Sequence, residues 1–216
     1  MFETKAGILL IAGLGFFVLA FLGNAVVPIL MYRNLPEQTA EELVNRYSLV
    51  QFEDLLQRYP DSFQKYIGEP TLKKCAESLR LGRRVYVGEG CWHCHSQFVR
   101  PVSNESRRWG PVPRSAEYQN ELQRPVMFGT SRVGPDLSRE GAMLRSNDWH
   151  AVHLFNPKLT SPNSVMPEYP WFFNGAPDRP NDRGLAILTY LQWLGTWLDD
   201  YPNIAALRFE QREGEY

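Results

Sequence analysis

The sequence predicts a mainly α-helical protein with one N-terminal transmembrane helix and one helical domain that contains long ordered loops. Three observations support this fold class: residues 6–32 include no charged residue, apolar residues recur at helical spacing in several later segments, and residues 96–148 are rich in Gly, Pro, Ser and Arg. The 216 residues are 44% hydrophobic and 13% aromatic, which favours a packed core over disorder. The net charge is −1, whereas nucleic-acid-binding proteins usually carry an excess of positive charge, so nothing in the composition indicates nucleic-acid binding.

Residues 1–33 are expected to form a membrane anchor, because about 20 apolar residues suffice to cross a bilayer as a helix. A cleaved signal peptide is the competing interpretation, but its apolar run is normally about 7–15 residues long and follows a positively charged segment. Here the run is longer, and Lys5 is accompanied by an acidic residue. Near the end of the run, Asn24 and Pro28 predict a bend or a polar partner.

Beyond the anchor, residues 34–70 are expected to form a helical extension or linker, and residues 71–216 the main domain. Helices are expected over residues 36–59, 71–87, 148–155 and 181–199. Pro60, in the sequence Pro-Asp-Ser, is a stop signal for the first of these helices, and Asp182 can cap the start of the last. The loop-rich region between the second and third helices is expected to wrap around a cofactor.

The residues Cys91-Trp92-His93-Cys94-His95 form a C-x-x-C-H motif. Each cysteine of such a motif can add to one vinyl group of a haem as a thioether, and the following histidine then lies beneath the iron as an axial ligand. A thioredoxin-like C-x-x-C would need a βαβ context, and a zinc site would need two further Cys or His ligands at suitable spacing. The third cysteine, Cys75, is expected to be a small buried hydrophobe. We therefore expect one covalently bound haem c.

The second axial ligand of the iron should come from a distant part of the chain. The candidates are Met127, Met143, Met166, His150 and His153. Met/His ligation is usual for electron-transfer cytochromes c and raises the reduction potential. Met166 is favoured because Pro167 and Pro170 stiffen the loop that would present its thioether. For each methionine, the alternative is a side chain that only fills the core.

Several of these features resemble class I cytochromes c. In that family a Gly-x-x-x-aromatic pattern on the helix before the haem motif crosses a C-terminal helix with aromatic residues, and the counterparts here are residues 82–86 and 190–193. A Gly-Pro-x-Leu segment follows, here residues 134–137. The resemblance implies that the Pro135 carbonyl accepts a hydrogen bond from Nδ1 of His95. It also implies that the favoured methionine, in the loop before the last helix, is the distal ligand.

The chain more closely resembles the mono-haem subunit II of cbb3-type cytochrome c oxidases. The matching stretches are residues 89–101, 134–137, 148–157 and 166–171. The single N-terminal membrane helix fits the same family. Two stretches depart from it: residues 33–80 are longer and more helical than expected, and the connection between Trp171 and the last helix is shorter.

This resemblance implies electron transfer in a respiratory complex, with no catalytic centre in this chain itself. The subunit would accept electrons from another cytochrome c and pass them to haem b of a haem–copper membrane subunit. Its haem domain would lie on the periplasmic side of the bacterial inner membrane, where haem c is attached. Arg100, Trp149, His150 and His153 match the family pattern, and we expect some of them to bond haem propionates or to contact the membrane subunit; structural packing is the alternative. The two histidines should share a helical face. The resemblance also suggests a calcium ion at the subunit interface, with Ser115 as a candidate contributor.

Two other functions stay open from the sequence. The same cytochrome could serve a nitric oxide reductase-like complex, or it could act alone as a membrane-tethered electron shuttle or a haem-based sensor. A sensor would need an open or easily displaced sixth position on the iron. The aromatic run at residues 169–173 favours a complex, since exposed rings of that size usually have a partner.

Overall fold

The computed structural model describes residues 4–34, 36–143 and 145–198. The chain divides into two compact units, Met1–Glu37 and Gln38–Tyr216. Within the described residues every regular element is a helix, and strand-like pairing is limited to two isolated bridges. The mainly α-helical fold class is therefore confirmed.

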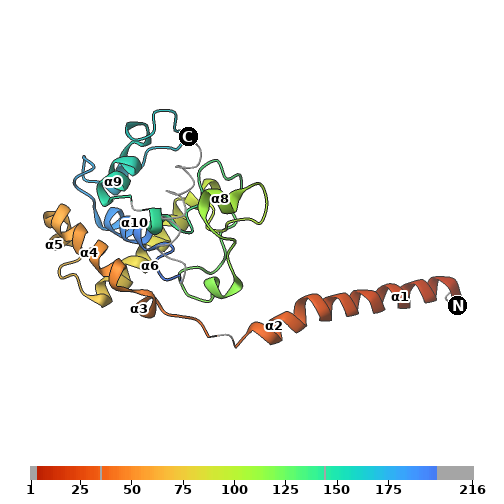
Figure 1. Ribbon diagram of the computed structural model, residues 1–216. Coiled ribbons are helices and arrows are strands. Elements are labelled where there is room, and N and C mark those ends of the chain that lie inside the picture. Colours follow the sequence, from red (N-terminus) through yellow and green to blue (C-terminus); the bar gives the residue numbers. More distant parts are fainter. Residues whose placement is uncertain (1–3, 35, 144, 199–216) are drawn as a thin grey trace. The chain divides into compact units, whose positions relative to one another are not determined.

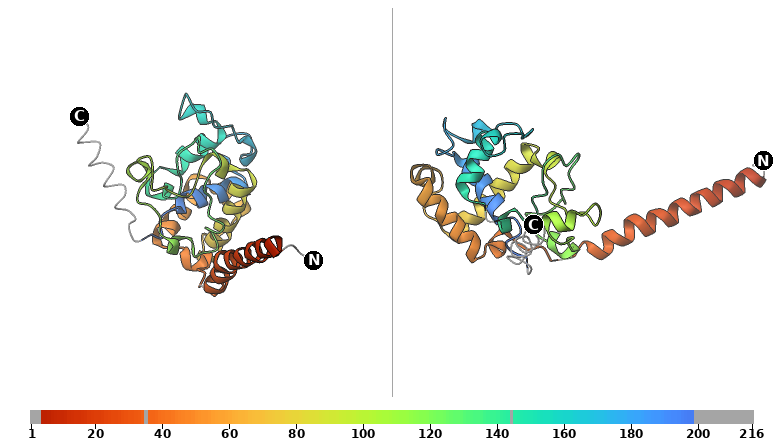
Figure 2. Two further views of the ribbon diagram at one scale, coloured as in Figure 1. Left: turned by 90° about the vertical axis from the view of Figure 1, so that its right-hand side faces the viewer. Right: turned by 45° about the horizontal axis from the view of Figure 1, so that its top comes forward.

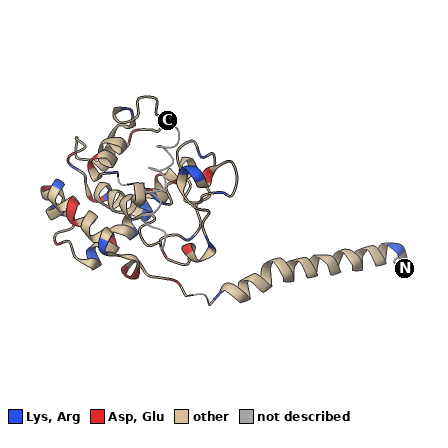
Figure 3. Cartoon of the chain, viewed as in Figure 1, with Lys and Arg blue, Asp and Glu red and all other residues tan. Residues whose placement is uncertain are grey.

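The first unit is a helical run with one irregular turn. It consists of α1 (Thr4–Phe21), the π-helical turn η1 (Leu22–Val26) and α2 (Val27–Tyr32). Together they make a 29-residue segment that is long and apolar enough to cross a bilayer, and Figure 3 shows charged residues only at its two ends. Pro28 has no N–H to donate to the preceding turn, and the wider π-turn accommodates this missing donor. In the same turn, Asn24 Nδ2 donates to the Ala20 carbonyl at 2.9 Å. The irregularity expected near the end of the run is therefore present.

The second unit begins with three short helices where the sequence predicted one. They are α3 (Ala40–Leu43), α4 (Arg46–Arg58) and α5 (Pro60–Tyr66). The prediction of an unbroken helix over 36–59 is wrong, because Asn45 leaves the helical path and caps α4 by accepting the Ser48 N–H at 2.9 Å. Pro60 follows the end of α4 as expected, but it also opens α5, since a missing N–H in the first turn removes no helical hydrogen bond.

These three helices pack against the later ones. The indole N–H of Trp193 donates to the Leu43 carbonyl at 3.2 Å. Phe52 and Phe63 meet edge to face in the same core, with ring centroids 5.0 Å apart. The segment expected as a separate extension therefore belongs, apart from its first residues, to the compact unit that carries the C-x-x-C-H motif.

At the centre of this unit α6 (Leu72–Gly88) crosses α10 (Asp182–Trp193), as Figure 1 and Figure 2 show. The crossing requires Gly82: a Cβ atom there would lie 2.6 Å from the Cβ of Tyr190 and would collide with the Ala186 carbonyl oxygen. Tyr86 and Tyr190 then pack with ring centroids 5.7 Å apart. The helix expected over 71–87 and the crossing implied by the resemblance are confirmed.

The last helix is shorter than the sequence predicts. Asn181, not Asp182, caps it, because the Asn181 side-chain oxygen accepts two backbone N–H groups at 3.1 and 3.0 Å. α10 ends at Trp193 instead of near residue 199, since the chain turns at Gly195 with a φ of +87°. Asp199, the end of the predicted helix, lies outside the described residues.

Loops and short helices connect α6 to α10, as expected. They include α7 (Cys91–Cys94), α8 (Glu105–Trp109), η2 (Ser115–Tyr118), η3 (Glu140–Met143), α9 (Asn147–Phe155), η4 (Pro157–Leu159) and η5 (Pro170–Phe172). Ser146 caps α9 by accepting the Trp149 N–H at 3.1 Å, so this helix begins at Asn147 rather than residue 148. Figure 1 shows α9 above α10 and α8 to its right.

Candidate haem site

The C-x-x-C-H motif forms one helical turn. α7 spans Cys91–Cys94, and the His95 N–H donates to the Cys91 carbonyl at 2.9 Å. Gly90 precedes the turn at a φ of +71°, a left-handed conformation that lets the chain leave α6 and start again. Cys91 is half-buried, Cys94 is exposed, and both thiols are free. A single turn places the two sulfur atoms on one side of the helix, as attachment to both vinyl groups of one porphyrin requires.

The His95 ring is oriented by a backbone carbonyl. Its Nδ1 atom lies 2.9 Å from the Pro135 oxygen, to which it can only donate, so Nε2 carries the lone pair that can bind iron. Gly134 makes room for the ring, because a Cβ atom there would lie 2.6 Å from Nδ1 and 2.7 Å from Nε2. Burial lowers the pKa of His95, against the opposing effects of the Pro135 carbonyl and Asp136, and this favours the neutral ligand form. The hydrogen bond implied by the resemblance is present.

These donors fit a porphyrin iron better than a bare metal ion. Among the described residues no three His, Cys, Asp or Glu side chains converge on one point. The motif instead offers two free thiols for carbon–sulfur bonds and one imidazole whose Nε2 is free to coordinate. A porphyrin brings its own in-plane nitrogen ligands, so the protein has to supply only axial groups. The chemistry of this donor set therefore fits haem c.

The three candidate methionines lie in different surroundings. Met127 is 6% exposed and belongs to the hydrophobic core, which fits a packing role. Met143 ends η3 and lines a small pocket. Met166 is half-buried at the edge of the core, and its backbone N–H donates to Ser164 Oγ at 3.2 Å. Met166 therefore combines a fixed backbone with a side chain that is not fully enclosed by protein.

Trp149 joins the two predicted histidines of α9 to an arginine. Its ring stacks on His153 with a centroid distance of 4.7 Å and an interplanar angle of 10°, and it meets His150 edge to face at 5.2 Å. The guanidinium of Arg145 lies 4.7 Å from the centre of the same ring. Arg145 was not among the predicted site residues, because it precedes the matching stretch and stands in a loop with no motif of its own.

His153 has a defined tautomer. Its Nδ1 lies 2.5 Å from Thr160 Oγ1, and that hydroxyl can donate onward to the Pro157 carbonyl at 3.2 Å. The ring nitrogen is then the donor to Thr160, which leaves Nε2 as an acceptor. Burial, followed by repulsion from His95 and Arg145, lowers the pKa of His153 to about 4. His153 is therefore neutral at pH 7 and within electrostatic reach of the predicted iron ligand.

His150 has different partners from His153. It is 4% exposed, and its Nε2 finds no hydrogen-bond partner among the described residues but lies 3.6 Å from Glu140 Oε1. Burial, followed by repulsion from Arg145 and His153, lowers the pKa of His150 to about 3. The two histidines are close enough to influence each other, yet one contacts Glu140 and the other Thr160.

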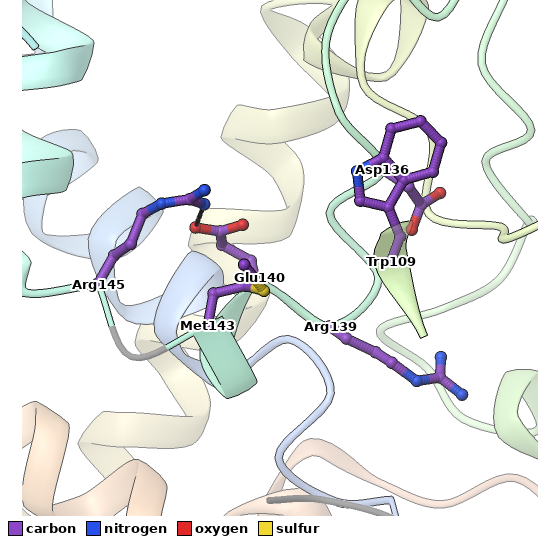
Figure 4. A pocket seen from close by; sticks show the side chains of 6 residues that line it. All are labelled: Trp109, Asp136, Arg139, Glu140, Met143 and Arg145. Carbon is purple, nitrogen blue, oxygen red and sulfur yellow. Dashed lines mark hydrogen bonds and ion pairs between the residues drawn. The ribbon is translucent and has the colours of Figure 1, made fainter. Parts of the chain in front are cut away.

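A small polar pocket lies beside these residues, with a cavity volume of about 40 Å³ (Figure 4). Its lining side chains are Trp109, Asp136, Arg139, Glu140, Met143 and Arg145. Glu140 and Arg145 face each other and form an ion pair. The volume suits a water molecule or a single polar group rather than a whole ligand. Charged residues buried in this way were missed from the sequence, since a lone Glu or Arg in a loop is normally exposed.

Arg100, another predicted site residue, is tied to a buried carboxylate. Its backbone N–H donates to Glu105 Oε2 at 2.7 Å, and its Nε lies 3.2 Å from Glu105 Oε1. Glu105 also pairs with Arg132, whose side chain is 5% exposed. The structure therefore gives Arg100 a structural partner and does not bring it to α9. Ser115, the candidate calcium contributor, is exposed at the start of η2.

The aromatic run at residues 169–173 is mostly buried, which corrects the expectation of an exposed cluster. Tyr169 stacks on Phe172 with a centroid distance of 5.5 Å, and Phe173 lies in the core with them. Trp171 is the exception at 50% exposed. The rings of Tyr169 and Phe172 cover each other because η5 turns the chain back on itself, so one indole of this run is left to meet a partner.

Cys75 lies apart from the motif. It is fully buried on α6, and burial raises the pKa of its thiol to about 12. A thiol with so little thiolate is unreactive, so the expected packing role of Cys75 is confirmed.

Comparison with known families agrees with this site. A family model described as cytochrome C oxidase, mono-heme subunit/FixO, matches residues 44–184. The match includes the C-x-x-C-H turn, the Pro135 segment, α9 and Met166. It also covers most of residues 33–80, the stretch that was expected to depart from the family. No individual curated protein matches the chain closely enough to add to this result.

Proposed function

We propose, from the premise that the chain belongs to the FixO family of mono-haem cytochrome c oxidase subunits, that it is the electron-transfer subunit of a cbb3-type oxidase complex. One haem c is attached through thioethers to Cys91 and Cys94, and its iron is held by His95 and Met166. The strongest support is the hydrogen bond from His95 to Pro135, because it prepares the imidazole in the tautomer and orientation that an axial ligand needs.

The haem, when bound, supplies a one-electron change between ferric and ferrous iron. The residues of this chain determine how readily that change occurs. The Pro135 carbonyl makes His95 more electron-donating, which favours the ferric state. The Met166 thioether acts in the opposite direction and raises the potential, which suits a carrier that must accept electrons from another cytochrome.

Residues at the start of α9 and in the loop before it would hold the propionate groups of the haem. Arg145 supplies the cation there, and it is already ordered by its ion pair with Glu140 and by the ring of Trp149. His150 and His153 are neutral at pH 7, so they would act through hydrogen bonds rather than charge. Arg100 has less support for this role, because its backbone N–H and its Nε both contact Glu105.

In this proposal electrons arrive from a donor cytochrome c and leave to haem b of the haem–copper membrane subunit. The α1–α2 segment would anchor the chain in the bacterial inner membrane with the haem on the periplasmic side. A calcium ion at the interface with that subunit belongs to the same proposal, with the exposed Ser115 as a contributor.

Purification of the native complex in mild detergent tests this assignment. The associated large membrane subunit should contain the haem–copper centre, and the complex should reduce oxygen with electrons from a reduced cytochrome c. If the complex reduced nitric oxide but not oxygen, the subunit would instead be assigned to a nitric oxide reductase-like complex. A haem-bearing chain that stays monomeric under the same conditions would contradict both assignments.

A further inference from the structure

Asp136 is a fully buried carboxylate beside the predicted iron ligand, and it accepts hydrogen bonds at both oxygens. Oδ2 accepts from the Ser96 hydroxyl at 2.5 Å and from the Phe98 N–H at 2.8 Å. Oδ1 accepts from the Ser138 N–H at 2.9 Å and from the Ser138 hydroxyl. Each oxygen therefore accepts one backbone N–H and one serine hydroxyl, so both oxygens of the buried side chain have hydrogen-bond partners.

Asp136 belongs to a network of buried charged side chains. Arg132 lies beside it, with Nη2 3.6 Å from Oδ2. Arg132 also forms an ion pair with the buried Glu105, so one guanidinium faces two carboxylates. Arg100 approaches Glu105 from the solvent side, where its side chain is 45% exposed and its charge is screened. Arg139, whose side chain is 3% exposed, lines the same pocket as Asp136 and pairs with Glu117, so Asp136 lies in a buried network of carboxylates and guanidinium groups.

The position of Asp136 links it to the ligand hydrogen bond. It follows Pro135, whose carbonyl accepts from His95, and its partner Ser96 follows His95. Backbone hydrogen bonds lie on both sides of the His95–Pro135 contact. The Gly134 N–H donates to the Cys94 carbonyl at 3.0 Å, and the Leu137 N–H donates to the Ser96 carbonyl at 2.9 Å. The carboxylate therefore holds together the two chain segments between which the ligand hydrogen bond forms.

We propose that Asp136 is a positioning residue for the axial histidine: it keeps the Pro135 carbonyl on His95 and places a fixed negative charge behind the imidazole. This inference rests on the proposed function, because it concerns the iron that His95 would bind. A negative charge close to the iron stabilises the ferric over the ferrous state and lowers the reduction potential. Asp136 would thus oppose the effect of the Met166 thioether.

Three variants of the full-length chain separate the charge from the hydrogen bonds. Asp136→Asn keeps the size of the side chain but removes the carboxylate and disturbs two of its four hydrogen bonds: the amide nitrogen can donate to the serine hydroxyl at its position, but the bond from the backbone N–H there is lost. Ser138→Ala removes one hydrogen bond and keeps the charge. Asp61→Asn, on the exposed surface of α5, is the matched control for loss of one carboxylate.

Each protein is purified in mild detergent, its haem content is measured, and two properties are recorded. Redox titration with mediators gives the ferric/ferrous equilibrium, and electron paramagnetic resonance gives the g values of the ferric haem, which report the axial ligand field. Asp136→Asn should shift the equilibrium about tenfold toward ferrous haem, or ~59 mV for a one-electron couple, and should change the g values. Ser138→Ala should change the g values with a smaller shift in potential, and Asp61→Asn should change neither.

The inference and the proposed function fail in different ways. A wild-type chain without haem would contradict the proposed function. A haem-loaded Asp136→Asn protein whose potential and g values equal those of Asp61→Asn, or whose potential is lowered, would overturn the inference alone. If Asp136→Asn does not accumulate with haem, Ser138→Ala and Ser96→Ala decide the matter: changed g values in both support the positioning role, and unchanged g values overturn it.

Discussion

Tyr86 donates a hydrogen bond to the carbonyl oxygen of His95 at 2.6 Å. The tyrosine is 1% exposed and packs on Tyr190 of α10, so the helix crossing and the backbone of the iron ligand form one continuous unit. Pro135 holds the imidazole of the same histidine from a separate loop. Both ends of His95 are therefore fixed by residues that lie outside the motif, which is how a short C-x-x-C-H turn gains a defined orientation.

The first prediction concerns the helix crossing. Gly82→Ala should lower the free energy of unfolding by roughly 1–3 kcal/mol, because the added methyl group meets the backbone carbonyl of Ala186, which cannot move without shifting α10. Gly88→Ala is the matched control on the same helix, since nothing lies within 4 Å of its Cβ position. Urea unfolding of the haem-loaded proteins measures both. Equal stability of the two variants would show that the helices do not cross this closely.

The second prediction concerns pH. The pKa of His150 is about 3 in the folded protein and about 6.5 in an unfolded chain, so the unfolded state binds more protons between these values. The contribution of the neutral His150 to the free energy of unfolding is fully present above pH 6.5 and is lost as the pH falls toward 3. The free energy of unfolding should therefore fall by at most about 1.4 kcal/mol per pH unit from this group. His150→Gln should reduce the slope of the unfolding free energy against pH on the acid side, because at most one proton fewer is bound on unfolding. An unchanged slope in unfolding experiments from pH 4 to 7 would contradict the buried neutral state.

The third prediction concerns the distal ligand. Met166→Ala should remove the absorption band that a methionine–iron bond gives ferric cytochromes, and it should lower the reduction potential, because the thioether favours ferrous iron. Met127→Leu is the control, since Met127 is 6% exposed in the core. Met143→Leu tests the competing candidate. Loss of the band in Met143→Leu but not in Met166→Ala would reassign the ligand.

Much of the fold could be predicted from the sequence. The anchor was marked by a long apolar run without charges, α6 by the glycines Gly88 and Gly90 at its end, and α9 by the Asn156-Pro157 stop. α10 was overextended because its leucine stripe continues through Leu194 to Leu198, while the chain leaves the helix at a left-handed glycine. Periodicity records which face is apolar, but a single backbone conformation decides where the helix ends.

Local spacing determines the geometry of the α7 turn, so its helical form could be predicted. The buried charges around it were not predicted. Glu105, Asp136 and Glu140 are buried, because arginines and hydroxyl groups compensate them. Those partners depend on how the loops close in space, and no local pattern in the sequence contains that information.

The covalent attachment of haem through the α7 turn is the central claim, and the denatured chain tests it most directly. After complete unfolding, the mass of the wild-type polypeptide should exceed the sequence mass by one haem, and the gel band should stain for haem peroxidase activity. Cys75→Ser should keep both signals, because that thiol is buried on α6, away from the motif. A wild-type chain that shows neither the mass increase nor the stain would contradict the account.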